Sequence, residues 1–257
     1  MLPYKNIICE IKNHIALITI NHPPANTWNL VTMEEFEHAV GEVASDNNVR
    51  VVMITGSGEK CFSAGFDVSD AANASITSPK GREVWRTLDR LSKPTVAVIN
   101  GHALGGGLEL AISCHFRIMV DRPDAMLGLT ELNLGIIPGW GGTQRLSRLV
   151  GRAKALDMIL FSKRINAREA LDIGLVDLVA DKDSLVKNAF EFAEKLALRP
   201  PVAVRCVLDA FSAGIYEGVD RGLEVEALGS ATVRDSEDKN EGFKAFLEKR
   251  QPCFQGK

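Results

Sequence analysis

The chain has 257 residues, of which 46% are hydrophobic and 25% are charged, a composition that fits a soluble globular protein with a sizeable core. Its net charge of −3 provides no overall basic field for binding nucleic acid or an anionic membrane. No apolar run reaches the length of a membrane-spanning helix, and the first segment, MLPYKNIICEIKNH, lacks the apolar core of a signal peptide.

The first half of the chain alternates β-branched apolar runs with helical stretches, which predicts an α/β domain with largely parallel strands. Apolar residues that recur at helical spacing from Met33 to Val43 predict the first helix. A polar stretch rich in Ala, Ser and Asn (69–80) precedes the second helix and is assigned no element of its own. The expected strands are 14–21, 49–56, 94–100 and 116–120, and the expected helices are 31–46 and 82–92.

Beyond about residue 145 the strand signal fades and helical segments dominate. No internal repeat or low-complexity linker is visible. We therefore expect a core over residues 1–195 and a helical C-terminal region over residues 196–257. The expected helices of this half are 152–161, 167–174, 184–199, 201–214 and 239–250.

Three consecutive glycines stand in GHALGGGLEL (101–110), between the predicted strand at 94–100 and the helical run LELAISC (108–114). Glycine is required where φ is positive or where another group must approach the backbone closely. The N-terminus of the following helix offers unpaired N–H groups, which suit an oxygen that bears negative charge. A tight turn that packs helix on strand explains the same stretch, so the glycines alone leave both interpretations open.

Two other loops have a similar character. FSAGFD (62–67) is a small-residue turn after a strand, and TELNLGIIPGWGGTQRL (130–146) holds Glu131 ahead of a Pro-Gly and a Gly-Gly loop. Taken singly, the first is most often a plain turn, and Glu131 is most often an ordinary helix or surface carboxylate. Together with Glu109 in the glycine segment, the three loops and two carboxylates form a more specific combination.

The order and spacing of SAGFD, GHALGGGLELAISC and TELNLGIIPGWGGTQRL resemble the enoyl-CoA hydratase/isomerase (crotonase) superfamily, and most of all an enoyl-CoA hydratase. The similarity includes GRAKAL and INAREALDIGLVD and runs from ITINHPPAN to the tail GFKAFLEKRQPCF. It implies an α/β fold, a crotonase-like spiral of ββα units with a helical C-terminal trimerisation region. It also implies an acyl-CoA thioester substrate, a homotrimer or dimer of trimers, and no cofactor besides the CoA of the substrate.

The resemblance assigns an oxyanion hole to the backbone N–H groups of Phe66 and Gly106, because fixed amide donors stabilise negative charge where it develops on the thioester oxygen. It assigns catalysis to Glu109 and Glu131. Syn addition of water to a 2-enoyl thioester needs a hydroxyl at Cβ and a proton at Cα, which two carboxyl groups can supply. The implied division has Glu109 deprotonating water and Glu131 protonating Cα, although coupled carboxylates leave that split open.

The resemblance also places residues around the substrate and its CoA. Family members hold the adenine near the SAGxD loop, which indicates Ala64 and Asp67, and Asp67 is also expected to hold this loop by hydrogen bonds. FLEKR resembles a segment whose Phe246 and Lys249 reach the CoA of a neighbouring subunit. Trp140 stands where the family commonly has a small residue, and it either lines the acyl pocket or simply packs. The first loop, NHPPANTWNL, lacks a basic residue that some relatives carry, so the phosphate contacts stay unassigned.

His102 and His115 lie near these motifs but match no catalytic position, so they are expected to be structural. The glycine run lacks G-x-G-x-x-G spacing, which argues against a dinucleotide site. The cysteines are scattered without a CxxC pair, which predicts a reducing, cytoplasmic setting and no metal site. They are Cys9, Cys61, Cys114, Cys206 and Cys253.

Other functions stay open as alternatives. An enoyl-CoA isomerase moves a double bond with essentially one carboxylate, and a cyclic dienoyl-CoA hydratase shares the machinery but has a different pocket. RNA binding through a lysine-rich first helix, as in one relative, is disfavoured because MEEFEHAVGEVASD carries five acidic residues and no lysine. A non-catalytic scaffold is disfavoured because both glutamate positions are filled.

Overall fold

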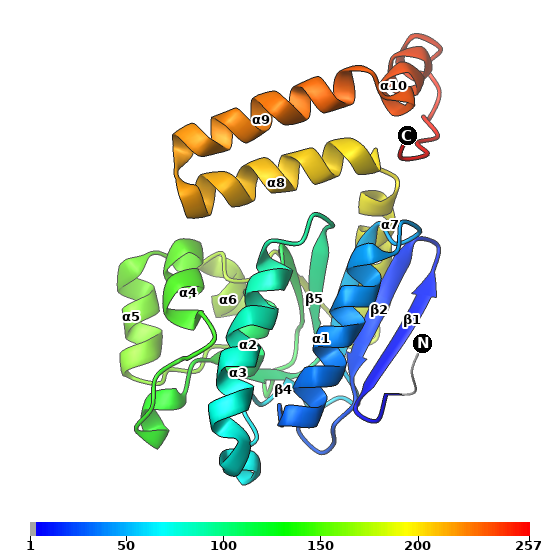
Figure 1. The fold of residues 1–257 in the computed structure, drawn as a ribbon. Coiled ribbons are helices and arrows are strands. Elements are labelled where there is room, and N and C mark those ends of the chain that lie inside the picture. Colours follow the sequence, from blue (N-terminus) through cyan, green and yellow to red (C-terminus); the bar gives the residue numbers. More distant parts are fainter. Residues whose placement is uncertain (1–3) are drawn as a thin grey trace.

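The computed structural model describes residues 4–257, which form two sheets surrounded by helices (Figure 1). The strands of the larger sheet are β1 (Ile7–Lys12), β2 (Ile15–Ile20), β3 (Val51–Gly56), β5 (Thr95–Ile99), β7 (Phe116–Val120) and β9 (Leu178–Ala180). They lie in the order β1-β2-β3-β5-β7-β9, and all neighbours except β1 and β2 run parallel. The predicted α/β domain with a largely parallel sheet is therefore confirmed.

The smaller sheet contains three short parallel strands. They are β4 (Cys61–Ser63), β6 (His102–Leu104) and β8 (Leu127–Gly128). The pairs β3–β4, β5–β6 and β7–β8 each give one strand to each sheet. Helices α2 (Ala74–Asp89) and α3 (Gly106–Ala111) follow the first two pairs, so the chain advances in the ββα units that the resemblance implied.

The centre of the large sheet is buried because helices and the small sheet cover it. Helix α7 (Leu185–Ala197) packs against β2, β3, β5, β7 and β9, whereas α1 (Leu30–Ser45) contacts β1 and α2. The side chain of Asn29 accepts a hydrogen bond from Thr32 N at 2.8 Å and caps the first turn of α1. Strand β5 is fully buried, as its continuous apolar sequence TVAVI predicts.

Two elements near the glycine segment differ from the prediction. Helix α2 begins at Ala74, behind the short 3₁₀ helix η1 (Val68–Asn73), and runs through the stretch that was assigned no element. Its buried face starts with Thr77 and Gly81, which carry no apolar signal in a sequence pattern. The strand at 94–100 ends at Ile99, and β6 lies between it and the glycines.

The helices α8 (Pro201–Glu217) and α9 (Val219–Arg234) pack side by side in a layer apart from the sheets, and α10 (Glu237–Leu247) lies at its far end (Figure 1). Helix α9 was not predicted. Its glycines allow close packing, because a Cβ at Gly222 would lie 2.8 Å from Cα of Gly214 and one at Gly229 would lie 2.8 Å from Cβ of Cys206.

The remaining helices lie between β8 and β9 along the chain and flank the loop that follows Glu131. They are η2 (Glu131–Leu134), α4 (Gly142–Val150), α5 (Arg152–Leu160) and α6 (Ala167–Asp172). Within residues 4–257, no helix is both long enough and apolar enough to span a bilayer.

Candidate active site

Each of the three glycines of the GGG segment is required for a different steric reason. Gly105 adopts a positive φ of 52° at the end of β6. A Cβ on Gly106 would lie 2.2 Å from Cζ3 of Trp140, and a Cβ on Gly107 would lie 2.2 Å from the carbonyl oxygen of Ser63. The segment is therefore both a left-handed turn and a place where protein groups pack closely on the backbone, as the tight-turn interpretation expects.

The FSAGFD turn lies directly against the glycine segment. Gly65 has a φ of +91°, and a Cβ there would lie 2.9 Å from the backbone nitrogen of Gly106. Neither the N–H of Phe66 nor that of Gly106 donates a hydrogen bond to an acceptor in residues 4–257. Two backbone donors on adjacent turns are therefore free to bind an oxygen of a ligand.

Glu109 lies in the first turn of α3, and its side chain is enclosed by the loop before α4. Only 2% of the residue is exposed. Its Oε1 accepts hydrogen bonds from Trp140 N at 2.8 Å and Gly142 N at 2.7 Å. Burial raises the pKa of Glu109, whereas these two N–H groups and the positive charge of Arg145 oppose the rise because they favour the carboxylate.

Glu131 is the first residue of η2, and its carboxyl group lies near that of Glu109 but has fewer hydrogen-bond partners. The residue is 9% exposed, and its buried Oε2 has no hydrogen-bond partner in the described part of the chain. Burial, and then the negative charge of Glu109, raise the pKa of Glu131 to about 7. Gly105 makes room for this carboxyl group, since a Cβ there would lie 3.1 Å from Oε1 of Glu131.

These groups line one cavity of about 440 Å³. The predicted site residues that it brings together are Ala64, Phe66, Gly106, Glu109, Glu131 and Trp140. The sequence reasoning missed its apolar wall, which includes Val68, Leu134, Ile136 and Ile137. Three of those residues belong to the LGIIPG stretch, where apolar residues next to a Pro-Gly turn were the signal available in the sequence. An apolar pocket with a few convergent polar groups is typical of a small-molecule site.

Trp140 both lines this cavity and packs into the core, so the alternatives left open by the sequence are not exclusive. Its ring lies between α2 and α3, because a Cβ on Gly81 would lie 2.7 Å from Cε2 of Trp140 and one on Gly106 would also collide with the ring. The indole packs edge-on against Trp85 and Phe66, with centroid distances of 5.3 and 6.4 Å. Trp140 is therefore a fixed wall of the cavity.

Three predicted site residues do not line the cavity. Asp67 accepts hydrogen bonds from Ser69 N at 3.0 Å and from Thr27 Oγ1 at 3.1 Å, so it ties η1 to the first loop. The side-chain hydrogen bond from Ser69 and the other donors lower its pKa. Phe246 and Lys249 lie at the end of α10, exposed and remote from the cavity of the same chain.

The two histidines near the motifs have structural partners. Nδ1 of His115 lies 2.8 Å from Thr95 Oγ1, and burial lowers the pKa of His115 to about 4. His102 accepts a hydrogen bond from Met126 N at 3.2 Å, and burial lowers its pKa as well. Neither residue lines the cavity. The described residues contain no cluster of His, Cys, Asp or Glu side chains that could hold a metal ion.

Comparisons with known proteins give a consistent result over the whole length. A family model described as enoyl-CoA hydratase/isomerase matches residues 10–257. A short-chain-enoyl-CoA hydratase of Clostridium acetobutylicum is 40% identical, with 96% of each chain covered. A crotonyl-CoA hydratase of Syntrophomonas wolfei is 39% identical, with 98% of this chain and 99% of the relative covered.

The fold is also found among solved structures. The crystal structure of an enoyl-CoA hydratase from Bacillus anthracis superposes with a TM-score of 0.94 at 39% identity, covering 98% of this chain and all of that one. The fold class expected from the motifs is therefore confirmed.

The raised pKa of Glu131 predicts a pH dependence of stability. The folded chain holds this proton more tightly than the unfolded chain, so the free energy of unfolding falls as the pH rises from about 4.5 to 7. Glu131→Gln removes this titration. Between pH 4.5 and 8, the free energy of unfolding of the variant should therefore rise by roughly 3 kcal/mol relative to that of the wild type. The measurement is urea unfolding at fixed protein concentration. Glu34→Gln on the exposed face of α1 is the control, and equal pH slopes for wild type and Glu131→Gln would contradict the prediction.

Proposed function

The chain belongs to the enoyl-CoA hydratase/isomerase family, and on that premise we propose that it adds water to the 2,3 double bond of a 2-enoyl-CoA thioester. The observation that carries this proposal is that two buried glutamates and two free backbone N–H groups line one apolar cavity. The enzyme is thus a hydro-lyase. The reaction itself requires no redox cofactor, because water adds to a double bond that the thioester already polarises.

The free N–H groups of Phe66 and Gly106 form the oxyanion hole of this proposal. Both would donate to the thioester oxygen, which gains negative charge as hydroxide adds to Cβ. The amides are held by adjoining turns, so they need no reorganisation during the reaction, and such fixed donors contribute strongly to the rate. The carbonyl stretching frequency of a bound enoyl thioester measures this polarisation directly.

The two glutamates divide the remaining proton transfers. Glu109, whose carboxylate is stabilised by two N–H donors, takes a proton from water while the hydroxyl oxygen bonds to Cβ. Glu131, with a pKa of about 7, is substantially protonated at neutral pH and gives its proton to Cα. The proton on Glu109 then returns to Glu131 through solvent, so each turnover consumes one water and leaves both groups unchanged.

Substitution of each carboxylate separates a hydratase from an isomerase. Glu109→Gln and Glu131→Gln should each lower kcat for crotonyl-CoA hydration by roughly 10²-fold or more, because glutamine cannot exchange a proton. The double variant should lose far less than the product of the two single losses, since the two groups act as one unit. The measurement is the loss of enoyl-thioester absorbance, with circular dichroism as the control for folding.

An isomerase would behave differently in the same assays. Isomerisation of a 3-enoyl-CoA would disappear with one substitution and survive the other, and hydration would be slight in the wild type. If a folded variant of either glutamate hydrates crotonyl-CoA at the wild-type rate, the two-carboxylate mechanism is wrong.

Trp140 limits the length of the acyl chain in this proposal. Its indole closes the cavity between α2 and α3, in a position fixed by Gly81 and Gly106. The relatives described as short-chain and crotonyl-CoA hydratases act on small acyl groups according to their names. A short 2-enoyl-CoA is therefore the preferred substrate class.

Trp140→Ala should shift the preference toward long chains. The ratio of kcat/KM for decenoyl-CoA to that for crotonyl-CoA should rise by roughly 10-fold or more, because each methylene buried in an apolar pocket contributes about 1 kcal/mol or more. Trp85→Phe is the matched control, since Trp85 contacts Trp140 but does not line the cavity. If both substrates lose activity in parallel, Trp140 is only a packing residue.

Residues 196–257 are the oligomerisation region of the proposed homotrimer or dimer of trimers. Helices α8 and α10 expose large apolar side chains that a single chain leaves uncovered. They are Val207, Phe211, Ile215, Phe243, Phe246 and Leu247. All five cysteines are unpaired, which supports a cytoplasmic setting. The acidic first helix and the net charge support a small-molecule partner rather than nucleic acid or a membrane.

The exposed end of α10 is proposed to reach the CoA of a neighbouring subunit. Lys249→Ala should then raise KM for CoA esters several-fold and leave kcat nearly unchanged, because the lost contact is equal in ground and transition states. Lys244→Ala, also exposed on α10, is the control and should change neither constant. A folded and active monomer in sedimentation, or an unchanged KM for Lys249→Ala, would contradict the proposal.

A further inference from the structure

The loop that holds Glu109 is itself held by Arg145. Nη1 of Arg145 donates to the carbonyl oxygen of Trp140 at 2.8 Å, and the N–H groups of Trp140 and Gly142 donate to Glu109. Gly141 makes this contact possible, because its φ is +108° and a Cβ there would lie 2.0 Å from Nη1. The guanidinium thus packs against the backbone of the loop, and only 11% of the Arg145 side chain is exposed.

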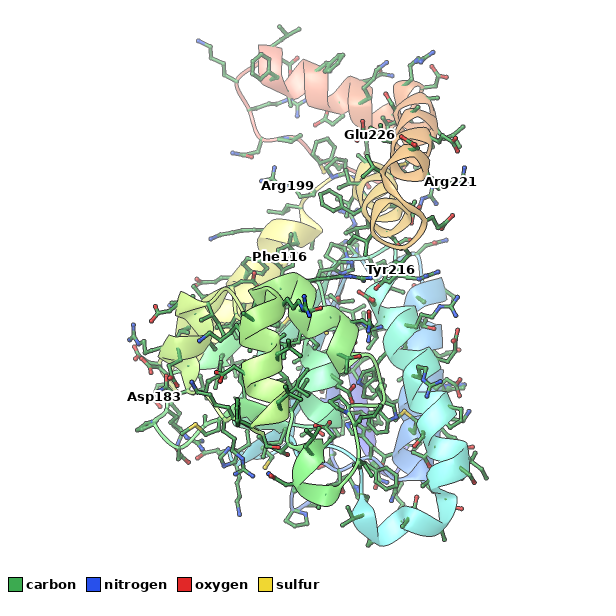
Figure 2. All side chains as sticks on the ribbon, turned by 90° about the vertical axis from the view of Figure 1, so that its left-hand side faces the viewer. Phe116, Asp183, Arg199, Tyr216, Arg221 and Glu226 are labelled. Carbon is green, nitrogen blue, oxygen red and sulfur yellow. The ribbon has the colours of Figure 1, made fainter. Side chains whose placement is uncertain are left out.

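Arg145 is in turn fixed by residues from two other elements. Its Nε donates to Oδ2 of Asp89 at 2.8 Å, at the end of α2. The hydroxyl of Tyr216 on α8 donates to the same carboxylate. The guanidinium groups of Arg90 and Arg148 lie 4.3 and 5.1 Å from the centroid of the tyrosine ring. Figure 2 shows Tyr216 at the junction between the C-terminal helices and the core.

We propose that Tyr216, Asp89 and Arg145 are positioning residues for Glu109, so that the docking of α8 on the core sets the geometry of the catalytic carboxylate. The contacts run from the tyrosine hydroxyl through the carboxylate and the guanidinium to the carbonyl of Trp140, and the N–H of the same residue reaches Glu109. None of the three side chains lines the cavity. The inference rests on the proposed function, because it assigns a role toward a carboxylate whose chemistry is part of that proposal.

The charges that act on Glu109 determine what loss of this network does. Glu131 on η2 repels a second negative charge in the cavity, whereas Arg145 on α4 and the two loop N–H groups favour the carboxylate. Loss of Arg145 removes a positive charge that favours the carboxylate, and the loop that it no longer fixes holds the two N–H donors less firmly against Glu109. The pKa of Glu109 therefore rises, and a larger fraction of the base is protonated at neutral pH.

The test is the pH profile of kcat/KM for crotonyl-CoA hydration in Arg145→Gln and Tyr216→Phe. Arg145→Gln should lose about 10-fold or more at pH 7, and the acidic limb of its profile should move up by roughly one pH unit. Tyr216→Phe removes one hydroxyl far from the substrate and should move the limb in the same direction by a smaller amount. Arg145→Lys keeps the charge but not the two-pronged contact, and should lie between Arg145→Gln and the wild type.

Arg148→Gln is the matched control, because it removes the same charge from the same helix. Arg148 contacts the ring of Tyr216, but unlike Arg145 it does not reach Asp89 or Trp140. Its profile should equal that of the wild type. A wild-type profile for Tyr216→Phe and Arg145→Gln, or an equal shift in Arg148→Gln, overturns the inference. If Arg145→Gln fails to fold by circular dichroism, Tyr216→Phe alone decides. A wild type that does not hydrate enoyl-CoA overturns the proposed function instead, so the two failures are distinguishable.

Discussion

The contact between two turns, one after β4 and one after β6, is the constraint on which the site depends. These strands are neighbours in the small sheet, so their C-terminal ends emerge side by side. Gly65 then approaches the backbone of Leu104 and Gly106 so closely that it tolerates no side chain, and the ring of Trp140 excludes a side chain at Gly106. Because the sheet holds the two turns together, the free N–H groups of Phe66 and Gly106 lie on adjacent turns. Side chains support both turns, since Ser63 Oγ accepts from Gly65 N and Trp85 Nε1 donates to the carbonyl oxygen of Gly106, each at 3.2 Å.

Burial is the second organising factor, and it has a cost. Burial raises the pKa of both carboxyl groups, and the negative charge of Glu109 raises that of Glu131 further, whereas only Glu109 is compensated by two N–H donors of the neighbouring loop. The buried Oε2 of Glu131 has no partner in the described residues. An unsatisfied buried oxygen destabilises the folded chain, and such a group is typical of a site that completes its hydrogen bonds with a ligand. In the proposed mechanism, this asymmetry between the two carboxyl groups is what makes Glu131 the acid and Glu109 the base at neutral pH.

The sequence predicted the α/β class and the longer parallel strands β2, β3, β5 and β7, because continuous β-branched runs such as TVAVI are typical of the middle of a covered sheet. It did not predict β1, an edge strand whose residues are mostly exposed and show no clear apolar alternation. It also did not predict β4, β6, β8 or β9, since strands of two or three residues are too short to show a period. The spiral was inferred only through resemblance, because the ββα units share a topology and not a side-chain pattern. Helix α9 was missed because its glycines serve helix contact, which a sequence pattern reads as a break.

The candidate site was predictable where a close approach excludes any side chain, as at Gly106, and where a motif fixes Glu109 and Glu131. The contacts of Arg145 with Asp89 and Trp140 were not predictable, because they join three elements far apart in the chain. The interlocking of Trp140 with Gly81 and Gly106 has an evolutionary consequence. A smaller residue at position 140 removes the nearest obstacle at both glycines. Once the end of the Met33 side chain, 2.9 Å from the added Cβ, has shifted as well, an alanine at 81 would strengthen α2 by about 1 kcal/mol. If Gly81→Ala comes first, its methyl group lies 2.7 Å from the indole of Trp140. On a mutational path from a narrow to a wide pocket, the substitution of Trp140 must therefore come before that of Gly81.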